Sequence, residues 1–574
     1  MAIFTRRTAL HTALLGGAAA CATKPKMTSF TALASGATDM FQHGVASGDP
    51  DATSVILWTR ITPQSADSNI QVSWEAASDA DFSSISASGM VTTGADRDFT
   101  VKAVASGLKP GQQYYYRFSA AGTTSAIGRT RTLPAGEVDA VRFAIVSCSN
   151  YPFGYFNVYD QIARRDDLHA VLHLGDYIYE YGPDGYGGDV GAALGRSHLP
   201  AKEITQLSEY RQRHAQYKSD TSAQAMHAAH PMIAIWDDHE TSNDAWKEGA
   251  ENHQPENEGN WSARRAAALQ AYYEWMPVRE PNAGRPREAL FKAYSFGDIL
   301  TLTALETRLM ARSRQFEYDE IVPSLKSPAD IANFRDNILW DGSREMMGQA
   351  QLDYMRKAFE KSRAEKQPWR LIANQVIMAD VTAPDLNPHV SEEELVALEQ
   401  QWDQARAFVA FSKLGLPANL DAWDGYPAAR ERFYDLAKET AAEGMIVLTG
   451  DTHTWWANDL TARDGAHMGV ELGVASVTSP SPYRPEFLGG KGAAYSLLTN
   501  QKNKSVRYLS GSSHGYIELE VRHDGAKGRF MAVDRIDSPT YNAFQQAAFK
   551  IEKRRGAAHF DAAKGVSFKE QWLF

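Results

Sequence analysis

Cysteine is nearly absent from this sequence. The only two cysteines are Cys21 and Cys148, and Cys21 lies at the edge of an apolar N-terminal stretch. The rest of the chain therefore has at most one thiol, which excludes an intrachain disulfide framework. A lone cysteine is a liability in an oxidising compartment unless it is buried or bound to a metal. Burial as a small apolar residue is the commoner fate of a free cysteine, so Cys148 is open to both interpretations.

Long hydrophobic runs are missing as well. The apolar run Ala13–Ala20 is too short to span a bilayer, and no other stretch is long and apolar enough to cross a membrane. The run follows a twin-arginine pattern in Thr5–Leu10, so residues 1–40 are predicted to be a leader for the twin-arginine export machinery. The mature protein is then expected in the periplasm or outside the cell. Cys21 is an alternative lipoprotein anchor, but Ala18 departs from the leucine usual there, which favours a soluble product.

The chain has fewer positively than negatively charged residues. The chain has 59 lysines and arginines against 70 aspartates and glutamates, a net charge of −11. This balance argues against a general nucleic-acid or anionic-membrane binder, and it is compatible with a carboxylate-rich site that needs cations before it accepts an anion. A hydrophobic fraction of 43% and a charged fraction of 22% are typical of a soluble globular protein. At 574 residues two or more domains are expected, in a monomer without a nucleic-acid-binding module.

The segment 41–134 has the pattern of a small β-sandwich, because short apolar runs alternate with turn signals. Leu108–Tyr114 is typical of the tyrosine corner found in immunoglobulin-like sandwiches. The candidate strands are Val55–Trp58, Ile70–Trp74, Thr100–Val101 and Tyr114–Phe118.

After Pro134 strands and helices alternate, which predicts an α/β domain. A long loop rich in glycine and aspartate is expected at Gly182–Leu199, where it could wall a cleft. A last helical pattern at Tyr541–Arg555 suggests a lid over the site. The other predicted helices are Asn157–Arg164, Ser208–Ala229 and Trp261–Trp275.

Several apolar runs end in residues that can bind metals. In α/β proteins ligands gather beyond the carboxyl ends of the strands. The ends of these predicted strands, called strand tips below, could therefore converge on one crevice. Four runs have this form: Val141–Val146 before Ser147–Asn150, Leu172–Leu174 before Gly175–Glu180, Met232–Trp236 before Asp237–Glu240, and Met445–Thr449 before Gly450–His453. A weaker fifth is Leu371–Ala373 before Asn374 and Gln375.

A single tip of this kind is more often a capped turn, but the set favours a metal site. Solvated turns do not require aspartate, histidine, cysteine and tyrosine together behind apolar strands. Tyr179 follows Asp176 by three residues, so its phenolate can reach the same point. A phenolate is a rare ligand that favours a hard, highly charged ion such as ferric iron, since only such an ion removes its proton at neutral pH.

In their order, these motifs resemble the PhoD-like family of alkaline phosphatases and phosphodiesterases, within the calcineurin-like metallophosphatases. The likeness extends from about Phe41 to about Val533. It implies an α/β fold with a two-sheet metallophosphatase sandwich flanked by helices, preceded by an immunoglobulin- or fibronectin-like β-sandwich. The implied domains are 41–134, a catalytic domain at 135–535, and a C-terminal helical lid or tail at 536–574.

The resemblance also implies an Fe(3+) ion and a neighbouring Ca(2+) ion, with Asp176 as the carboxylate that bridges them. The other implied ligands are Cys148, Tyr179 and His453 for iron, and Asp238, Asn374 and Asp451 for calcium. The purple acid phosphatases have asparagine in place of Asp238 and histidine in place of Asp451. An added charge and a lost nitrogen donor argue against zinc at the second position.

Asp238 and His239 are the candidate catalytic residues. His239 could protonate the leaving alkoxide or hold a phosphoryl oxygen, and its structural alternative is a bond to Glu240 or a backbone carbonyl. Two further charged segments, Glu306–Arg308 and Asp421–Arg430, are open between a cleft-lining and a bracing role.

The predicted activity is metal-dependent hydrolysis of phosphate mono- or diesters by a metal-activated hydroxide. A phospholipase D-like phosphodiesterase could share the same site. A non-catalytic surface protein that binds metal or phosphate is the remaining alternative, but it would have no use for a thiolate, a phenolate and His239 together.

Overall fold

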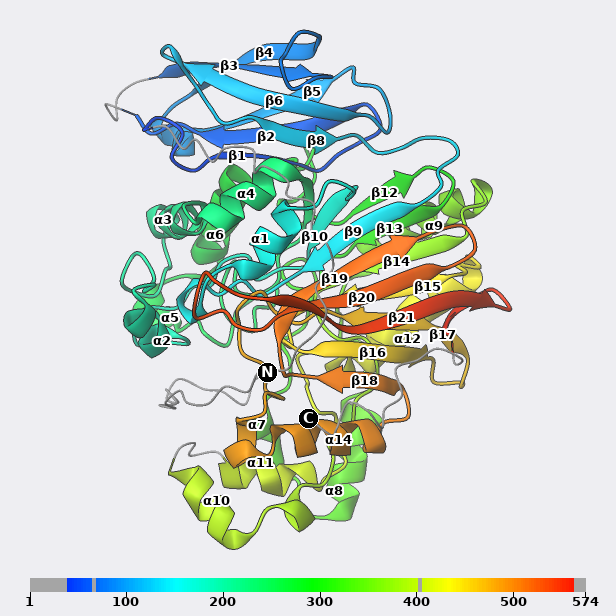
Figure 1. Cartoon of the computed structure of the whole chain (residues 1–574). Coiled ribbons are helices and arrows are strands. Elements are labelled where there is room, and N and C mark those ends of the chain that lie inside the picture. The colour runs from blue at the N-terminus through cyan, green and yellow to red at the C-terminus, as the bar shows by residue number, and fades with distance from the viewer. Residues whose placement is uncertain (1–38, 64–68, 401–404, 562–574) are drawn as a thin grey trace.

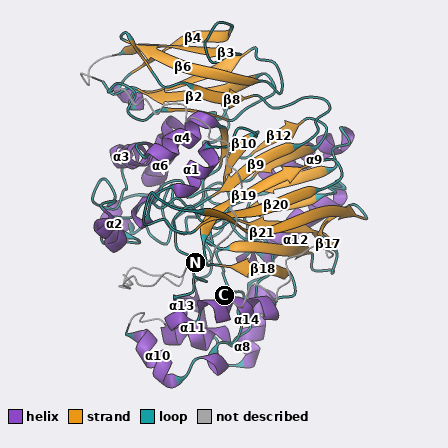
Figure 2. Cartoon of the chain, viewed as in Figure 1, coloured by secondary structure: helices purple, strands orange, loops and turns teal. Residues whose placement is uncertain are grey.

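The computed structural model describes residues 39–63, 69–400 and 405–561. Figures 1 and 2 show three parts along the long axis: a small β-sandwich, a central pair of large sheets covered by helices, and a helical group beyond the second sheet. The predicted twin-arginine segment falls almost wholly outside the described residues. Within them, no helix combines the length and the apolar character needed to cross a membrane.

The N-terminal β-sandwich has the predicted architecture. One layer is formed by β1 (Val45–Gly48), β2 (Ser54–Arg60) and β5 (Thr100–Ser106), and the other by β3 (Ile70–Ala77), β4 (Ile85–Thr93), β6 (Gln113–Ala120), β7 (Thr123–Thr124) and β8 (Gly128–Arg131). Alternate side chains of both layers, such as Leu57 and Phe118, meet in one apolar core. The tyrosine corner is present, because the backbone N–H of Lys109 donates to the Tyr114 hydroxyl at 2.8 Å.

This sandwich is continuous with the central part of the protein. β1 pairs in parallel with β11, so the first layer continues into the large central sheet. That sheet has ten strands in the order β22-β21-β20-β19-β9-β10-β11-β1-β2-β5. Its other members are β9 (Val141–Val146), β10 (Ala170–His173), β11 (Pro231–Ala234), β19 (His514–Val521), β20 (Ala526–Val533), β21 (Ala543–Arg554) and β22 (Ala557–Phe560).

A second sheet of seven strands packs against it, in the order β12-β13-β14-β15-β17-β16-β18. The strands are β12 (Lys292–Phe296), β13 (Leu300–Ala304), β14 (Trp369–Ala373), β15 (Met445–Thr449), β16 (Trp455–Thr461), β17 (His467–Gly473) and β18 (Val506–Ser510). Phe143 and Ile145 of β9 share one buried cluster with Leu371 of β14 and Leu448 of β15. The two-sheet sandwich expected from the motifs is thus confirmed.

Both outer faces of the sandwich are covered by helices. Side chains alternate along a strand, so Ala144 and Val146 of β9 point away from the second sheet and pack under helices, among them α1 and α6. The helices on this side are α1 (Asn157–Ala163), α3 (Leu207–Lys218), α4 (Thr221–Ala229) and α6 (Trp261–Trp275). On the other side lie α9 (Gln349–Ala364) and α12 (Pro427–Glu439). Two short helices, α2 (Gly188–Leu194) and α5 (Pro255–Glu258), lie in connections.

The third part of the molecule is a group of short helices beyond the second sheet (Figure 1). They are α7 (Tyr318–Ile321), α8 (Pro328–Asn333), α10 (Glu392–Glu399), α11 (Ala405–Ser412), α13 (Phe487–Gly490) and α14 (Gly492–Lys502). Segments far apart in sequence therefore meet here, and they share the apolar cluster that underlies α9 and α12.

Two local predictions, at Ser208–Ala229 and Gly182–Leu199, need correction. The pattern at Ser208–Ala229 forms two helices, because the Asp220 carboxylate caps α4 by accepting from the N–H groups of Ser222 and Ala223 at 2.9 and 3.2 Å. The expected loop Gly182–Leu199 contains α2, which ends at Gly195 in the left-handed conformation.

The predicted helix at Tyr541–Arg555 is wrong, because this segment is mostly β21. Ala547, Phe549 and Ile551 are buried at every second position, a period of two that belongs to a strand. β21 is hydrogen-bonded on one side to β20 and on the other to β22, so it cannot serve as a lid. The tail beyond residue 561 lies outside the described residues.

Candidate metal centre

The predicted ligand tips come from both sheets. β9, β10 and β11 are neighbouring parallel strands of the first sheet, and β14 and β15 are parallel neighbours in the second. Cys148, Asp176 and Asp238 follow the first three strands, and Asn374 and Asp451 follow the other two. Parallel strands end at the same edge of a sheet, so the fold brings these positions to one rim of the sandwich.

The backbone of four residues at three strand tips is held in the left-handed region. The φ angles are 61° at Cys148, 56° at Asp176, 61° at Asp451 and 53° at His453. Residues other than glycine adopt this region rarely, and they keep it only where the surrounding structure enforces it. Four of the residues that the sequence singles out therefore have this uncommon backbone conformation.

The side chains form three overlapping groups. The potential ligand atoms within each group all lie within 4.8 Å of one another, and every member is buried. Asp176 belongs to the first two groups and Asp238 to the last two, so the groups form a continuous chain. The groups are Cys148, Asp176 and His453; Asp176, Asp238 and His239; and Asp237, Asp238 and Asp451.

Tyr179 joins the first group. Its hydroxyl donates to Oδ2 of Asp176 at 3.0 Å and lies 3.3 Å from Nε2 of His453. Ser479, which sequence reasoning did not single out, donates to the same phenolic oxygen at 2.8 Å. Burial raises the pKa of Tyr179 well above its usual value, and the Asp176 carboxylate raises it further. A phenolate here consequently requires a cation beside it.

Cys148 and His453 complete that group with a sulfur and a nitrogen donor. Burial, then the nearby Asp176 carboxylate, raises the pKa of the Cys148 thiol well above its usual value, so a thiolate also needs a cation. Nδ1 of His453 donates to the carbonyl of Pro480 at 3.1 Å, which leaves Nε2 as the potential ligand atom. Burial lowers the pKa of His453 to about 3, and the neutral imidazole is the form that binds metals.

Several carboxylate oxygens at the centre have no hydrogen-bond partner among the described residues. They are Oδ1 of Asp176, Oδ2 of Asp237, Oδ1 of Asp238 and Oδ2 of Asp451. Burial raises the pKa of Asp451 to about 7. Buried carboxylates are costly unless they are paired or coordinate a metal, so this donor set fits bound cations. The group around Cys148 mixes sulfur, nitrogen and oxygen donors, whereas the group around Asp451 offers carboxylate oxygens only.

Asn374 is buried, but its side chain is already engaged. Its Nδ2 donates to the Val376 carbonyl at 2.6 Å, and its Oδ1 accepts from the indole of Trp423 at 3.3 Å. Among the described residues, no hydrogen bond links its side chain to Asp238 or Asp451. The structure therefore places Asn374 at a strand tip of the rim, with its side chain hydrogen-bonded to Val376 and Trp423.

Arg308 lies at the rim, and the sequence left its role open between lining a cleft and bracing the sheet. Its guanidinium is fully buried, donates to Asp237 at 2.5 Å and to Asp421 at 2.7 Å, and lies 3.6 and 3.7 Å from carboxylate oxygens of Asp238 and Asp451. The sequence signal was a charged pair, Glu306 and Arg308, directly after an apolar strand. Arg308 both braces the rim and offsets part of its negative charge.

His239 has an unexpected partner. Its Nδ1 lies 2.8 Å from Oε2 of Glu180, and its ring stacks on Tyr179 with centroids 4.1 Å apart. Glu240, the predicted alternative, accepts instead from the backbone N–H groups of Asp176, Tyr177 and Asp237 at 3.1, 2.6 and 2.9 Å. Glu240 therefore fixes two strand tips relative to each other.

The Glu180–His239 pair favours a protonated imidazole. Burial alone would lower the pKa of His239, but the carboxylates of Asp238, Asp176 and Glu180 outweigh it and raise that pKa well above its usual value. The other oxygen of Glu180 accepts from the backbone N–H of Asn243 and from the amide of Asn252, both at 2.8 Å. The carboxylate is thus held in one orientation, and the imidazole with it.

Comparison with known proteins identifies the family. The model of the PhoD-like phosphatases matches residues 143–530, and the model of the PhoD-like N-terminal domain matches residues 26–134. The chain belongs to the PhoD-like phosphatase family. Alkaline phosphatase D of Bacillus subtilis (strain 168) is 32% identical over 535 residues, which cover 89% of this chain and 81% of that protein. A solved structure of PhoD superposes with a TM-score of 0.74 at 28% identity, covering 95% of each chain.

As a PhoD-like phosphatase, the protein is a phosphoric ester hydrolase. Its substrate carries negative charge, as does the rim where the three groups meet. Arg308 faces the carboxylates of Asp237, Asp238, Asp421 and Asp451, and Arg312 pairs with Asp421 as well. Cations at the groups around Asp176 and Asp238 would reverse this balance and allow a phosphate to approach.

Proposed function

We propose that this PhoD-like phosphatase is an exported, metal-dependent hydrolase of phosphate mono- and diesters. The observation that carries the proposal is the continuous chain of buried ligand groups, with unpartnered carboxylate oxygens, at one rim of the sandwich. A phosphate ester resists attack because its oxygens are negatively charged. Bound cations neutralise it and lower the pKa of a coordinated water until hydroxide is available.

The donor types support a division between two kinds of ion. A thiol, a phenol and a neutral imidazole at Cys148, Tyr179 and His453 suit Fe(3+), with Asp176 shared between the ions. The oxygen donors of Asp238 and Asp451 suit Ca(2+). Asn374 can join the proposed calcium set through its Oδ1, because an amide oxygen has a second lone pair beside the one that accepts from Trp423.

Around these ions, the chain itself supplies proton transfer and positioning. His239, held by Glu180 and next to Asp238 and Asp176, is placed to donate a proton to the leaving alkoxide. Asp238 orders its own loop, because its Oδ2 accepts from the backbone N–H of Asp244 at 2.6 Å. Arg308 holds the carboxylates of Asp237 and Asp421 in position.

Hydrolysis of two chromogenic esters of one phenol tests this function. The monoester and the bis-ester are incubated with purified protein before chelation, after prolonged calcium chelation, and after calcium is restored. We expect turnover that chelation abolishes and calcium restores, at neutral to alkaline pH. Activity that survives prolonged chelation refutes the calcium assignment, and no hydrolysis of any mono-, di- or triester refutes the catalytic proposal. A strong preference for the bis-ester would favour the phosphodiesterase alternative, phospholipase D-like enzymes included.

Export is a separate element of the proposal, because it rests on the sequence of residues 1–40. Replacing Arg6 and Arg7 by lysine keeps the charge but alters the twin-arginine pattern. We expect the wild-type enzyme in the periplasmic or extracellular fraction and the variant in the cytoplasm. Equal export of both proteins would contradict the twin-arginine route.

A further inference from the structure

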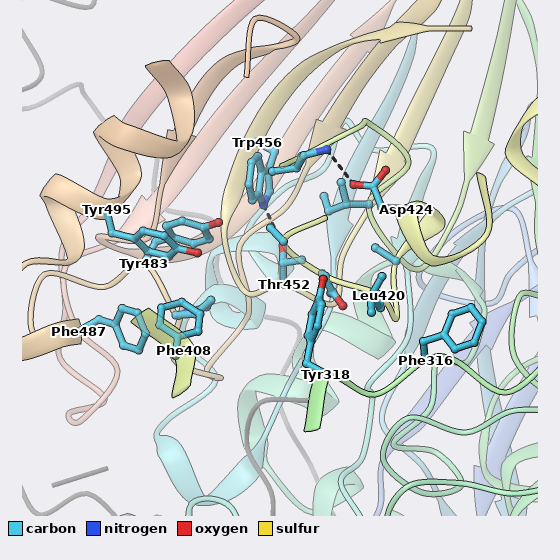
Figure 3. Close-up of a pocket in the computed structure, with 16 residues that line it drawn as sticks. Phe316, Tyr318, Phe408, Leu420, Asp424, Thr452, Trp456, Tyr483, Phe487 and Tyr495 are labelled. Carbon is cyan, nitrogen blue, oxygen red and sulfur yellow. Dashed lines mark hydrogen bonds between the residues drawn. The ribbon is translucent and has the colours of Figure 1, made fainter. Parts of the chain in front are cut away.

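A cavity of about 90 Å³ is lined in part by the loop that carries two residues of the candidate metal centre, and Figure 3 shows the side chains around it. Thr452 in its wall stands between Asp451 and His453 in the chain. Leu420, also in its wall, precedes Asp421, which accepts from Arg308 at 2.7 Å. The shared loop from Asp451 to His453 is the basis for a ligand that spans the cavity and the metal centre.

The walls of this cavity are aromatic. Tyr318 of α7, Phe408 of α11 and Tyr495 of α14 come from the helical group, and Trp456 comes from β16. The rings brace one another: Tyr495 is parallel to Tyr483 at a centroid distance of 4.7 Å, and edge-on to Phe408 at 5.9 Å. Figure 3 shows these rings arranged around the space. Such packing gives the cavity a fixed shape.

The polar groups of the wall are already satisfied. The indole N–H of Trp456 donates to the Thr452 hydroxyl at 2.9 Å. Asp424 is paired with Arg430 at 2.6 Å and accepts from the backbone N–H of Val381 at 2.8 Å. The wall consequently provides no unpaired charge for a charged ligand, and a neutral apolar group fits best. Offset and edge-on contacts with the surrounding rings favour a planar aromatic group over a flexible chain.

We propose that this cavity binds an uncharged aromatic group of the ester while the phosphoryl group occupies the metal centre. The inference rests on the proposed function, and it narrows the substrates to arylalkyl or aryl phosphate esters. The cavity is small, so a single ring is the aromatic group proposed for it. The helical group, which contributes four of the rings, would then select the substrate that is hydrolysed at the metal centre between the two sheets.

Benzyl phosphate and methyl phosphate provide a direct test on the wild-type holoenzyme. Both lose the alkoxide of a primary alcohol of similar basicity, so a difference in kcat/KM reports binding of the ring rather than intrinsic reactivity. Burial of the phenyl ring should raise kcat/KM for benzyl phosphate by about tenfold or more. Equal values for the two esters overturn the proposal. A preference for octyl phosphate over benzyl phosphate also overturns it, because the cavity would then accept an acyl-like chain.

A variant that fills the cavity sharpens the test. Ala418 lines the wall and is half-buried, so Ala418→Phe places a ring inside the cavity. The ratio of kcat/KM for benzyl over methyl phosphate should fall about tenfold towards one. Phe544→Ala is the matched control, because Phe544 is 42% exposed on β21 and does not line the cavity. An unchanged ratio in a folded Ala418→Phe enzyme contradicts the proposal.

The affinities of analogues that are not hydrolysed test the cavity proposal without a variant and without turnover. Benzylphosphonate and methylphosphonate bind but are not hydrolysed, so their affinities for the holoenzyme can be compared by calorimetry. We expect about tenfold tighter binding of benzylphosphonate. If no ester is hydrolysed but benzylphosphonate binds tighter, the catalytic proposal fails and the cavity proposal stands. If esters are hydrolysed without any preference for the ring, the cavity proposal fails and the catalytic proposal stands.

Discussion

Replacing Glu180 by glutamine should slow the hydrolysis of alkyl phosphates far more than that of 4-nitrophenyl phosphate. An alkoxide needs a proton as it leaves, whereas 4-nitrophenolate is stable without one. In the structure Glu180 holds Nδ1 of His239 at 2.8 Å with one oxygen and accepts two amide donors with the other. Glutamine keeps the size of the side chain but loses the charge. Its NH₂ group must also face either the imidazole or those two donors.

The size of the effect follows from the hydrogen bond that is lost. A hydrogen bond to a charged group contributes about 1.5–3 kcal/mol. If it is made in full only when His239 is protonated, its loss lowers kcat/KM for an alkyl ester by roughly 10- to 150-fold. For 4-nitrophenyl phosphate the expected loss is below about threefold, because proton donation contributes little to that reaction.

The pH profile gives a second readout. Glu180 is one of three carboxylates that raise the pKa of His239, so its neutralisation lowers that pKa. An acid catalyst is lost as pH rises through its pKa, and the alkaline fall of kcat for the alkyl ester should therefore move to lower pH in Glu180→Gln. The assay is steady-state kinetics on both esters across the pH range.

Glu471→Gln is the matched control. Glu471 is buried and accepts from the backbone N–H of Met378 at 2.6 Å and from the amide of Asn458 at 2.8 Å, but it contacts no histidine in these hydrogen bonds. Any loss there should be equal for both esters. Equal losses in Glu180→Gln would refute the reasoning, because they would show that Glu180 only orders the loop around Asn243 and Asn252.

Three further variants test the metal centre and the core. Tyr179→Phe keeps the ring but removes the phenolic oxygen. The visible absorption expected of an Fe(3+)–phenolate centre should therefore fade, and activity should fall about 10- to 100-fold. Normal activity and no iron by elemental analysis would contradict the iron assignment. Cys148→Ser should shift that absorption and weaken iron retention, measured as metal content after dialysis, since a hydroxyl is a weaker ligand than a thiolate. Lys218 is buried, and burial lowers its pKa well below the usual value. Its unfolded form then binds a proton that the folded form lacks, so wild-type stability should rise with pH towards about 10.4. Lys218→Met should raise Tm at pH 7 and lose that advantage at higher pH, whereas a Tm several degrees lower at pH 7 would show that the contact with His227 outweighs the cost of burial.

Local patterns in the sequence predicted much of the fold. Short apolar runs between turn signals predicted β2, β3, β5 and β6 of the N-terminal sandwich, but not β1, β4, β7 or β8. Apolar runs before ligand-type residues predicted the tips of β9, β10, β11 and β15. The break between α3 and α4 was also readable, since Ser219 and Asp220 are typical of a new helix start. These features depend on residues close together in the chain, which is why the sequence suffices for them.

The C-terminal strand shows the limit of such patterns. The apolar residues around Ala547 and Phe549 are compatible with either period, and isolated propensity favoured a helix. Pairing with β20, which lies near in the fold, decided in favour of a strand. An edge that offers unpaired backbone groups outweighs a weak local preference.

By itself, the sequence determined which residues end the strands, and therefore which side chains are available for a metal centre. Only the tertiary structure decided how their charges are balanced. Glu180 meets His239 across 59 residues, and Arg308 meets Asp237 across 71. No local pattern encodes these pairs, because a buried charge is stabilised by whichever opposite charge or hydrogen-bond donor the packed sheets bring within reach.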